Sequence, residues 1–391
     1  MAKRLPGFFI CCLILGLCVT FWGCGSGSHF CGDCCAAACP ALGSPFLYAT
    51  TTSNQILGFS IASSGALTPI ASTPGPANSP SIAGAGWGLL FADNPSNQVV
   101  GESQDIQSGL LTAVPGSPFS LGSVSGGPNS IMIGPNNGNF YATEPDGTIV
   151  GYAISGNVPS VPLTGSPYAA GIAPSQMAFA QLPSSSSATY TLYASDSGDP
   201  NGGILAFTIA LDGSLSPIAG SPFPTAPNAG PSYLLNGENN AGSQFLFVSL
   251  SNAGQIAGFS IDNTTGGLTP VPGSPFTAGK GPGTLLGSRT ADQLFVINTG
   301  DHTVEAFSVA TNGTLQPLGS PVAVGTASGG MAYRPQSAES SSQLYTADTA
   351  AGSIEIVNVD NSTGAMSAGG TVSTSSPPLQ LVIDQFPFVF Q

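Results

Sequence analysis

Hydrophobic and polar positions alternate along this chain in short blocks that recur every 43 to 54 residues. The clearest block, residues 244–288, reads QFLFVSLSNAGQIAGFSIDNTTGGLTPVPGSPFTAGKGPGTLLGS. Apolar runs at 245–248, 255–261, 267–271 and 283–287 are separated by turns rich in Gly, Asn, Asp and Pro. Short runs bounded in this way predict β-strands. The block therefore predicts one four-stranded antiparallel sheet.

An aromatic residue marks the same position of each repeat. It occurs seven times, at Tyr48, Phe91, Tyr141, Tyr193, Phe247, Phe295 and Tyr345. A strand such as ILGFSI, IVGYAI or IAGFSI follows each aromatic, and several connectors carry Ser-Pro-Phe. Repeats of this length indicate a repeat architecture, and four-stranded sheets around a central channel form a propeller. The sequence predicts an all-β fold, a seven-bladed β-propeller of four-stranded antiparallel blades.

The order of the strands predicts how the ring closes. The repeated region begins at 46–50 (FLYAT), which is the second strand of a blade, and ends at 379–384 (LQLVID), which is a first strand. We expect the C-terminal strand to complete the first blade and so to tie the two ends of the stack together. The run 386–390 (FPFVF) resembles a further second strand, which would cap the first blade or compete with 46–50.

The composition agrees with a turn-rich β fold. Gly and Pro number 53 and 34, and charged residues make up only 6% of the chain. Such a composition also occurs in disordered chains, but 41% hydrophobic residues in regularly spaced strands favour a folded domain. The net charge is −14, and the basic residues Lys280, Arg289 and Arg334 are too scattered to follow a phosphate backbone. Nucleic-acid binding is disfavoured.

The N-terminus has the pattern of a secretory signal. Lys3 and Arg4 precede the apolar run 8–21, which is shorter than a membrane-spanning helix requires. Gly23-Cys24 resembles the cleavage site of bacterial lipoproteins, which implies that Cys24 becomes a lipidated N-terminus. Simple secretion and an uncleaved anchor are the alternatives.

Three segments are therefore expected. Residues 1–23 form the signal peptide, 24–45 a Cys- and Gly-rich tether, and 46–391 the propeller. This organisation predicts an exported protein of the cell envelope, in the periplasm, at the outer membrane or on the cell surface. Its membrane partner would be reached through the lipid on Cys24.

All eight cysteines lie at or before Cys39. The four that follow the lipidation motif are Cys31, Cys34, Cys35 and Cys39. In an oxidising compartment they predict two disulfides. With His29 they could instead form a zinc knuckle, but the spacing lacks two separated Cys-x-x-Cys arms. We expect disulfides, no metal and no cofactor.

Several motifs resemble those of one superfamily. Strands such as FLFVS and IAGFSI, the turns Asp262–Gly266 and Asp360–Gly364, and the run GLTPVPGSPF are similar to the lactonase-type seven-bladed propellers. These have YVTN-type repeats and include phosphogluconolactonase-like and muconate-cycloisomerase-like proteins. The resemblance covers about residues 46–391. It implies hydrolysis of sugar or muconate lactones by His, Arg and Glu side chains in the central channel, yet no position here matches a family catalytic residue.

Candidate site residues lie in the turns between second and third strands, which share a face with the connectors between blades. These turns carry Asp93, Glu144, Asp146, Asp196, Asp199, Asp301, His302 and Asp348. Carboxylates grouped at one face favour a cation or a cationic ligand. Asp also favours tight turns because its side chain bonds to its own backbone. Both interpretations fit.

The densest group combines two neighbouring repeats. Asp301, His302 and Glu305 lie in the sixth, and Asp348 and Glu355 lie in the seventh. Adjacent carboxylates can have different pKa values and act as acid and base. The same residues could equally be solvated strand ends.

Glu102 occupies a position that other repeats fill with Phe or Tyr, where a buried carboxylate without partners is costly. No Ser-His-Asp spacing and no phosphate-binding loop occur in 46–391. The sequence therefore predicts an exported binding or interaction module for an unknown small-molecule or protein ligand, with no assigned catalytic residue. The alternatives are a lactonase-family hydrolase acting on a sugar lactone and a structural role in surface assembly.

Overall fold

The computed structural model describes residues 45–384, except for short gaps at 77–78, 86–87, 94–95, 123–125, 136, 156–157, 184–188, 239–241, 289–291, 327 and 335–340. Within these residues the chain consists of strands and turns, without a helix. Accordingly, no segment of the described chain is a helix suited to crossing a bilayer. The expected lipidation site Cys24, the cysteines Cys31, Cys34, Cys35 and Cys39, and the run 386–390 lie outside the described residues.

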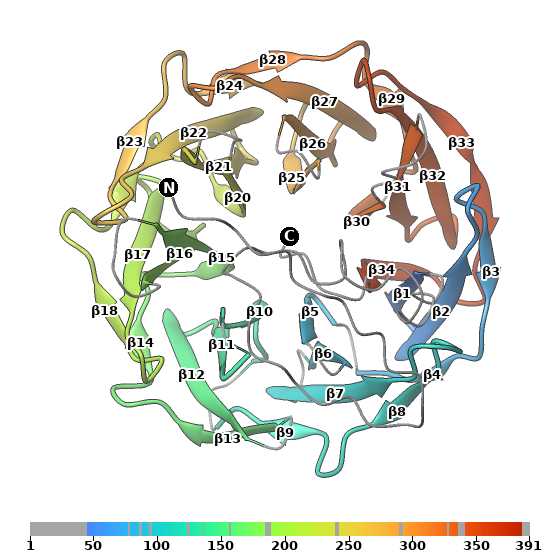
Figure 1. Ribbon diagram of the computed structural model, residues 1–391, viewed down its shortest axis with the longest axis horizontal. Coiled ribbons are helices and arrows are strands. Elements are labelled where there is room, and N and C mark those ends of the chain that lie inside the picture. Colours follow the sequence, from blue (N-terminus) through green and yellow to red (C-terminus); the bar gives the residue numbers. More distant parts are fainter. Residues whose placement is uncertain are drawn as a thin grey trace, which may run out of the picture. The chain divides into compact units, whose positions relative to one another are not determined.

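Seven antiparallel sheets are arranged around a central axis, as Figure 1 shows. Blade 1 consists of β34 (Pro378–Asp384), β1 (Phe46–Thr51), β2 (Gln55–Ile61) and β3 (Leu67–Pro69); blade 2 of β5 (Ile82–Ala85), β6 (Gly88–Asp93), β7 (Gln98–Gln104) and β8 (Leu111–Ala113); blade 3 of β10 (Ser130–Ile133), β11 (Asn139–Thr143), β12 (Thr148–Ser155) and β13 (Val158–Pro162).

Four further blades complete the ring. Blade 4 consists of β15 (Pro174–Leu182), β16 (Thr189–Asp196), β17 (Gly203–Ile209) and β18 (Leu215–Pro217); blade 5 of β20 (Pro231–Glu238), β21 (Gln244–Leu250), β22 (Gln255–Ile261) and β23 (Leu268–Pro270); blade 6 of β25 (Pro282–Gly287), β26 (Gln293–Asn298), β27 (Thr303–Val309) and β28 (Leu315–Pro317); blade 7 of β30 (Ser328–Arg334), β31 (Ser341–Asp348), β32 (Ser353–Asp360) and β33 (Met366–Ser373). The predicted all-β, seven-bladed propeller is confirmed.

A short fifth strand follows the outer strand in six blades and pairs with the third strand. These are β4 (Thr73–Pro74), β9 (Phe119–Ser120), β14 (Tyr168–Ala169), β19 (Phe223–Pro224), β24 (Phe276–Thr277) and β29 (Val322–Ala323). The Ser of the Ser-Pro-Phe motif explains the position of this strand. In blade 5, for example, the Ser274 hydroxyl accepts a hydrogen bond of 2.9 Å from the Gly258 amide in the middle of the third strand. The motif therefore fastens the connector to its own blade.

The ring closes as the strand order predicts. β34 pairs antiparallel with β1, and Tyr48 lies opposite Val382. Two side chains of blade 7 then bind backbone carbonyls of blade 1. Tyr345 donates to the Gly65 carbonyl over 2.8 Å, and the buried Arg334 donates to the Ala62 carbonyl over 2.7 Å. The two ends of the described propeller are thus joined by a strand ladder and by side-chain bonds.

One buried hydrophobic cluster lies between each pair of neighbouring blades. In six blades the repeated aromatic packs toward the next blade, and wherever it is Tyr its hydroxyl also binds the turn of that blade. Tyr193, for example, donates to the Gly266 carbonyl over 2.7 Å. The other such pairs are Tyr48 with Gly109, Tyr141 with Gly213 and Tyr345 with Gly65. Each acceptor Gly has a positive φ, which orients its carbonyl toward the tyrosine. The prediction is wrong for blade 2, where the pairing of β6 with β7 is shifted by one residue and Phe91 packs with Tyr48 between blades 1 and 2.

A second set of bonds joins the blades close to the axis, where the first strands lie (Figure 1). We call it the inner hydroxyl belt. Its bonds connect Thr50 with the Ser79 carbonyl, Ser81 with the Ile131 amide, Thr143 with the Ser175 carbonyl, Ser195 with the Ser232 carbonyl, Ser232 with the Pro282 carbonyl, Thr284 with the Gly329 carbonyl and Thr349 with the Pro378 carbonyl. Every blade boundary is crossed once by these bonds. The small polar residues of the inner strands therefore have a structural use.

Candidate functional site

The turns between second and third strands place the candidate residues at one end of the blades. In each blade the residue before the third strand has a positive φ. These residues are Asn54, Asn97, Gly147, Gly202, Gly254, His302 and Gly352. Gly and Asn tolerate this left-handed conformation well, whereas a larger side chain is uncommon there. His302, at φ 57°, is the one exception among the seven.

The acids that end the second strands of blades 4 and 7 accept hydrogen bonds from backbone amides. In blade 4 the Asp196 carboxylate accepts hydrogen bonds of 2.8 Å from the amides of Ile172 and Ala173. In blade 7 the Asp348 carboxylate accepts bonds of 3.0 Å from the amides of Ala350 and Ala351 in its own turn. These acids thus satisfy backbone donors, as the turn interpretation expects.

The two glutamates of the candidate group have the same local role. Glu305 accepts a bond of 3.3 Å from the Gly279 amide, and Glu355 accepts one of 2.8 Å from the Gly325 amide. Both donors belong to the connector that enters the same blade. Burial raises the pKa of each carboxyl, while these amide bonds partly oppose the rise. The glutamates therefore hold the connectors at the point where these enter blades 6 and 7.

The mouth of blade 6, formed by Lys280, Asn298, Asp301, His302 and Glu305, contains polar atoms without a partner. Asp301 accepts a bond of 2.6 Å from the Lys280 amide, and Asn298 donates to Glu305 over 3.3 Å. The carbonyl oxygen of the fully buried Asn298 side chain and Nδ1 of His302 are both buried and have no hydrogen-bond partner among the described residues. Buried polar atoms of this kind cost free energy unless a ligand or solvent satisfies them.

The predicted five-residue group divides by blade, with Asp301, His302 and Glu305 in blade 6 and Asp348 and Glu355 in blade 7. Asp301 raises the pKa of Glu305, and Asp348 raises the pKa of Glu355, so each glutamate has its acidic neighbour in its own blade. Among the described residues, no group of three or more His, Cys, Asp or Glu side chains is placed to hold a metal ion. The acids of blade 6 and those of blade 7 are therefore described as two separate sets of hydrogen-bonding groups.

Glu144 is the most perturbed acid of this face. It follows β11 in blade 3, at the position that Asp196 and Asp348 occupy in their blades, and it is fully buried. Within the described part of the chain neither carboxyl oxygen has a hydrogen-bond partner, and burial, together with the charge of Asp146, raises the pKa of Glu144 to about 8. In the sequence, Glu144 differs from the aspartates at this position only by its longer side chain. That difference does not reveal that the Glu144 carboxyl accepts no bond from a backbone amide.

Glu102 occupies the aromatic position predicted for it. It lies opposite Leu89 in β6, as Phe59 lies opposite Leu47 in blade 1, and it is 4% exposed. Burial raises its pKa to about 7. It lies at the boundary between blades 1 and 2, so it belongs to the packing of the ring.

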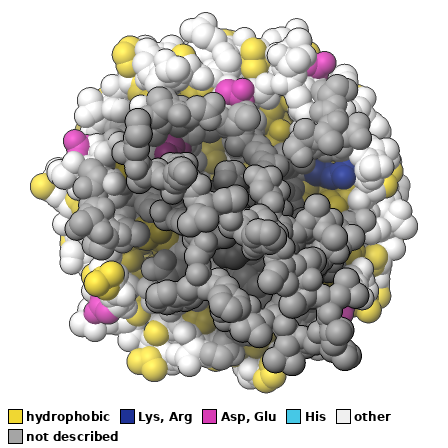
Figure 2. All heavy atoms as spheres, in the orientation of Figure 1, with side chains coloured by type: hydrophobic (Ala, Val, Ile, Leu, Met, Phe, Trp, Pro, Cys, Tyr) yellow, Lys and Arg dark blue, Asp and Glu magenta, His cyan; other side chains and the backbone are white. Residues whose placement is uncertain are grey.

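The described charges are sparse on the face that Figure 2 shows. Single acidic side chains are separated by uncharged surface, and they do not merge into one patch on the described part of this face. Arg334 is buried and donates to the Ala62 carbonyl, and Arg289 lies outside the described residues. Arg334 is therefore a structural residue of the closure.

No family model and no functionally curated protein matches the sequence. Solved structures do match. The periplasmic gluconolactonase PpgL of Pseudomonas aeruginosa has a TM-score of 0.72 at 17% identity, over 88% of this chain and 99% of that one. A putative 6-phosphogluconolactonase of Bacteroides fragilis has a TM-score of 0.69 at 18% identity, over 87% and 98%.

A functionally unknown protein of Desulfotomaculum acetoxidans is also similar, with a TM-score of 0.62 at 15% identity, over 88% of this chain and 99% of that one. Identities this low establish architecture and leave chemistry open. Together with the seven-blade arrangement, they show that this chain has the fold of the lactonase-type seven-bladed β-propellers.

Proposed function

We propose that the chain is an exported binding module whose ligand is held at the mouth of blade 6. The observation that carries this proposal is His302, a left-handed residue where the six other blades have Gly or Asn. Such strain is kept where a side chain is needed, so an outlier of this kind motivates a functional hypothesis. Two buried atoms at this mouth, the carbonyl oxygen of the Asn298 side chain and Nδ1 of His302, lack a partner among the described residues. They would accept hydrogen bonds from a ligand.

A screen of metabolites and metal ions against the mature protein tests this proposal. The key variant is His302→Asn, because Asn adopts the left-handed conformation without strain and occurs at this position in blades 1 and 2. We expect the variant to fold and to lose ligand binding. A ligand that binds wild type and His302→Asn equally would place the binding site elsewhere.

A lactone hydrolase is the second candidate function. The similarity to proteins described as gluconolactonases favours it. In this chain Glu305, whose pKa is raised by burial, would act as the acid or base, and His302 would lie next to the substrate. Turnover of a sugar lactone that is lost in both His302→Asn and Glu305→Gln would support the enzyme. An absence of turnover across γ- and δ-lactones would support the binding module.

Export and anchoring are part of the same proposal. The basic and apolar leader, Gly23-Cys24 and the name of the periplasmic neighbour support passage through the inner membrane and lipidation of Cys24. Intact-mass analysis of the mature protein tests both steps. A mass that begins at Cys24 and includes acyl chains is expected; a mass without acyl chains would leave secretion and would remove the lipid anchor. Reductant-dependent mass shifts would test the two disulfides expected among Cys31, Cys34, Cys35 and Cys39.

A further inference from the structure

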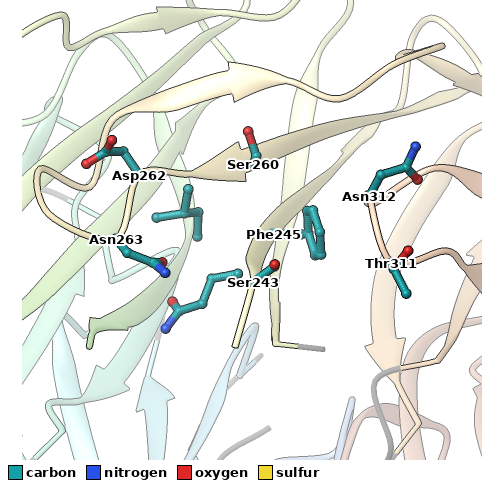
Figure 3. Close-up of a pocket in the computed structure, with 9 residues that line it drawn as sticks. Ser243, Phe245, Ser260, Asp262, Asn263, Thr311 and Asn312 are labelled. Carbon is teal, nitrogen blue, oxygen red and sulfur yellow. The ribbon is translucent and has the colours of Figure 1, made fainter. Parts of the chain in front are cut away.

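The outer edge of blade 7 differs from the outer edges of the other six blades. In five of these the outer strand has only three residues, after which the chain leaves the sheet and returns as the short fifth strand. In blade 5, for example, the turn of Asp262 and Asn263 that Figure 3 shows leads into an outer strand that already ends at Pro270. The outer strand of blade 3 has five residues and contains two prolines. Short strands and prolines are devices that keep a sheet edge from pairing with another chain.

β33, the outer strand of blade 7, has neither device. It runs for eight residues (MSAGGTVS) without a proline or a charged residue, and one β-bulge at Gly369 interrupts its pairing with β32. Among the described residues no further strand pairs with it. Residues 367–371 are exposed, and Figure 1 shows β33 on the outer rim of the ring. Blade 7 therefore has a long open edge.

Alternate residues of β33 present their backbone groups to the outside. The Asp360 amide donates to the Ala365 carbonyl over 2.9 Å, so the backbone groups of Ala365 point toward β32. This direction alternates along an antiparallel pair, so the amides and carbonyls of Met366 and Ala368 point away from β32.

The same orientation holds beyond the bulge. The Thr374 amide donates to the Gly352 carbonyl over 2.9 Å, so the backbone groups of Ser373 and Thr371 point outward. Both halves of the edge therefore have backbone donors and acceptors that no described strand pairs with. Extended peptides bind to open sheet edges through such groups.

A hollow of about 130 Å³ lies beside this edge, between blades 6 and 7. Its lining includes Glu355 and Val357 of β32, Ala368 and Thr371 of β33, and Ala323 of β29 in blade 6. Val357 packs in the hydrophobic cluster between these two blades, and Glu355, two residues before it in the same strand, points to the same side. The bond from a connector amide holds the Glu355 carboxylate in place. The hollow therefore combines apolar walls with one fixed carboxylate.

We propose that the edge of β33 binds an extended, basic peptide segment of a partner protein as a further strand of blade 7. Neighbouring strands lie about 4.8 Å apart, so the added strand would lie about 10 Å from β32. A short side chain does not reach across that distance, whereas a Lys or Arg side chain that enters the hollow would meet the Glu355 carboxylate.

The charge of the chain favours this occupant over a second copy. An open edge could also pair with the same edge of another molecule. The net charge of −14 repels a second copy of this chain and attracts a basic segment. The surface is separate from the mouth of blade 6, since the two share no residue.

Short peptides of alternating Thr and Val, with Lys, Arg, Leu or Glu at the centre, test the proposal against the full chain at neutral pH. Fluorescence anisotropy measures the affinity, and hydrogen exchange shows where the peptide binds. We expect the Lys- and Arg-centred peptides to bind saturably, to slow exchange within residues 366–373, and to bind about tenfold more tightly than the Leu-centred peptide. Glu355→Gln keeps the acceptor for the connector amide and should remove this preference.

A pair of Ala→Pro variants tests the edge itself. Ala368→Pro removes one outward amide of β33 and should weaken the binding of every peptide about tenfold. Ala113→Pro in β8 of blade 2 is the matched control. The Val114 amide donates to the Gly101 carbonyl over 2.9 Å, so the Ala113 amide also points outward, and β3, β18, β23 and β28 have Pro at this position. Thermal unfolding checks that both variants fold.

Saturable binding of the basic peptides that Ala368→Pro weakens and Ala113→Pro leaves unchanged supports the proposal. It is overturned if no peptide binds saturably, if the Glu-centred peptide binds as tightly as the Lys-centred one, or if a bound peptide leaves exchange in β33 unchanged. Dimerisation of the chain that Ala368→Pro abolishes would assign the edge to a second copy and would also overturn it.

Discussion

At the scale of single residues, most described acids of the propeller serve its backbone. Asp196, Glu305 and Glu355 accept bonds from connector amides, and Asp348 accepts bonds from its own turn. Glu144 and Glu102 differ because they are buried and accept no bond from a connector amide, and burial raises the pKa of Glu102 to about 7 and that of Glu144 to about 8. We expect these two residues to make the stability of the ring depend on pH.

We expect the free energy of unfolding to fall as the pH rises from about 5 to about 8. A carboxyl whose pKa is higher in the folded state keeps its proton only there, so its contribution is full below the ordinary value of 4.5 and is lost as the pH rises toward the folded value. The window ends near pH 7 for Glu102 and near pH 8 for Glu144. Each group contributes a slope of up to about 1.4 kcal/mol per pH unit.

Urea unfolding at several pH values measures this slope. Glu102→Gln and Glu144→Gln imitate the protonated acids and should flatten it, most of all when combined. Asp105, Asp212, Asp262 and Asp360 have lowered pKa values, so their effect falls below pH 3.8 and does not overlap this window. An unchanged slope in the double variant would show that other groups cause the pH dependence.

Variants of His302 measure how much its left-handed conformation lowers the free energy of unfolding. Replacement by Asn or Gly should raise the free energy of unfolding by about 1 kcal/mol, because the left-handed conformation costs a larger side chain about 1–2 kcal/mol. Chemical denaturation measures the change, and Gly352→Ala in blade 7 is the opposite control, which should destabilise by a similar amount. A destabilised His302→Asn would mean that the imidazole itself contributes to the packing of the turn.

At the scale of elements, the repeat determines nearly everything that the sequence predicts correctly. Seven copies of the same strands identify the blades and the pairing of β34 with β1, and they identify the inter-blade aromatic in every blade except blade 2. The fifth strands are absent from the prediction because two residues are too short to show a hydrophobic period. The boundaries of the third-to-fourth turns differ by a residue or two for the same reason.

The hydrogen bond that a tyrosine makes between blades can be tested by removing its hydroxyl oxygen alone. Tyr193→Phe should lower the free energy of unfolding by about 1–3 kcal/mol, because the Gly266 carbonyl loses its side-chain donor within a buried interface. Tyr190→Phe in the same strand is the control, since its side chain is partly exposed and its hydroxyl has no hydrogen-bond partner among the described residues. Equal stabilities of the two variants would show that burial of the ring is sufficient, as it is at Phe247 and Phe295.

β34, the strand that closes the ring, is the element whose deletion we expect to destabilise the protein most. Deletion of residues 379–391 removes nearly all of β34 and exposes the inner edge of β1, so we expect a large drop in the melting temperature or failure to fold. Deletion of 385–391 leaves β34 intact and separates its effect from that of the run 386–390. A melting temperature unchanged by the longer deletion would contradict closure by β34.

At the scale of the whole molecule, the sequence predicts the ring far better than the site. The ring follows from a pattern repeated seven times, whereas each site contact depends on a pair of residues distant in sequence. Glu305 and the Gly279 amide are 26 residues apart, and Arg334 and the Ala62 carbonyl are 272 apart. The sequence identifies Asp301, His302 and Glu305 as neighbours in one turn, but it does not show which of their atoms are already bonded.

Joining β1 to β34 has a consequence for biogenesis. β1 is translated before the other blades, whereas β34, its lateral partner, follows all of them, and an exported chain would cross the translocon in the same order. Throughout that interval β1 presents unpaired amides and carbonyls, which are a template for wrong partners. Any cell that makes this protein must shield that edge until β34 arrives, and a product terminated before β34 carries the open edge for its whole lifetime.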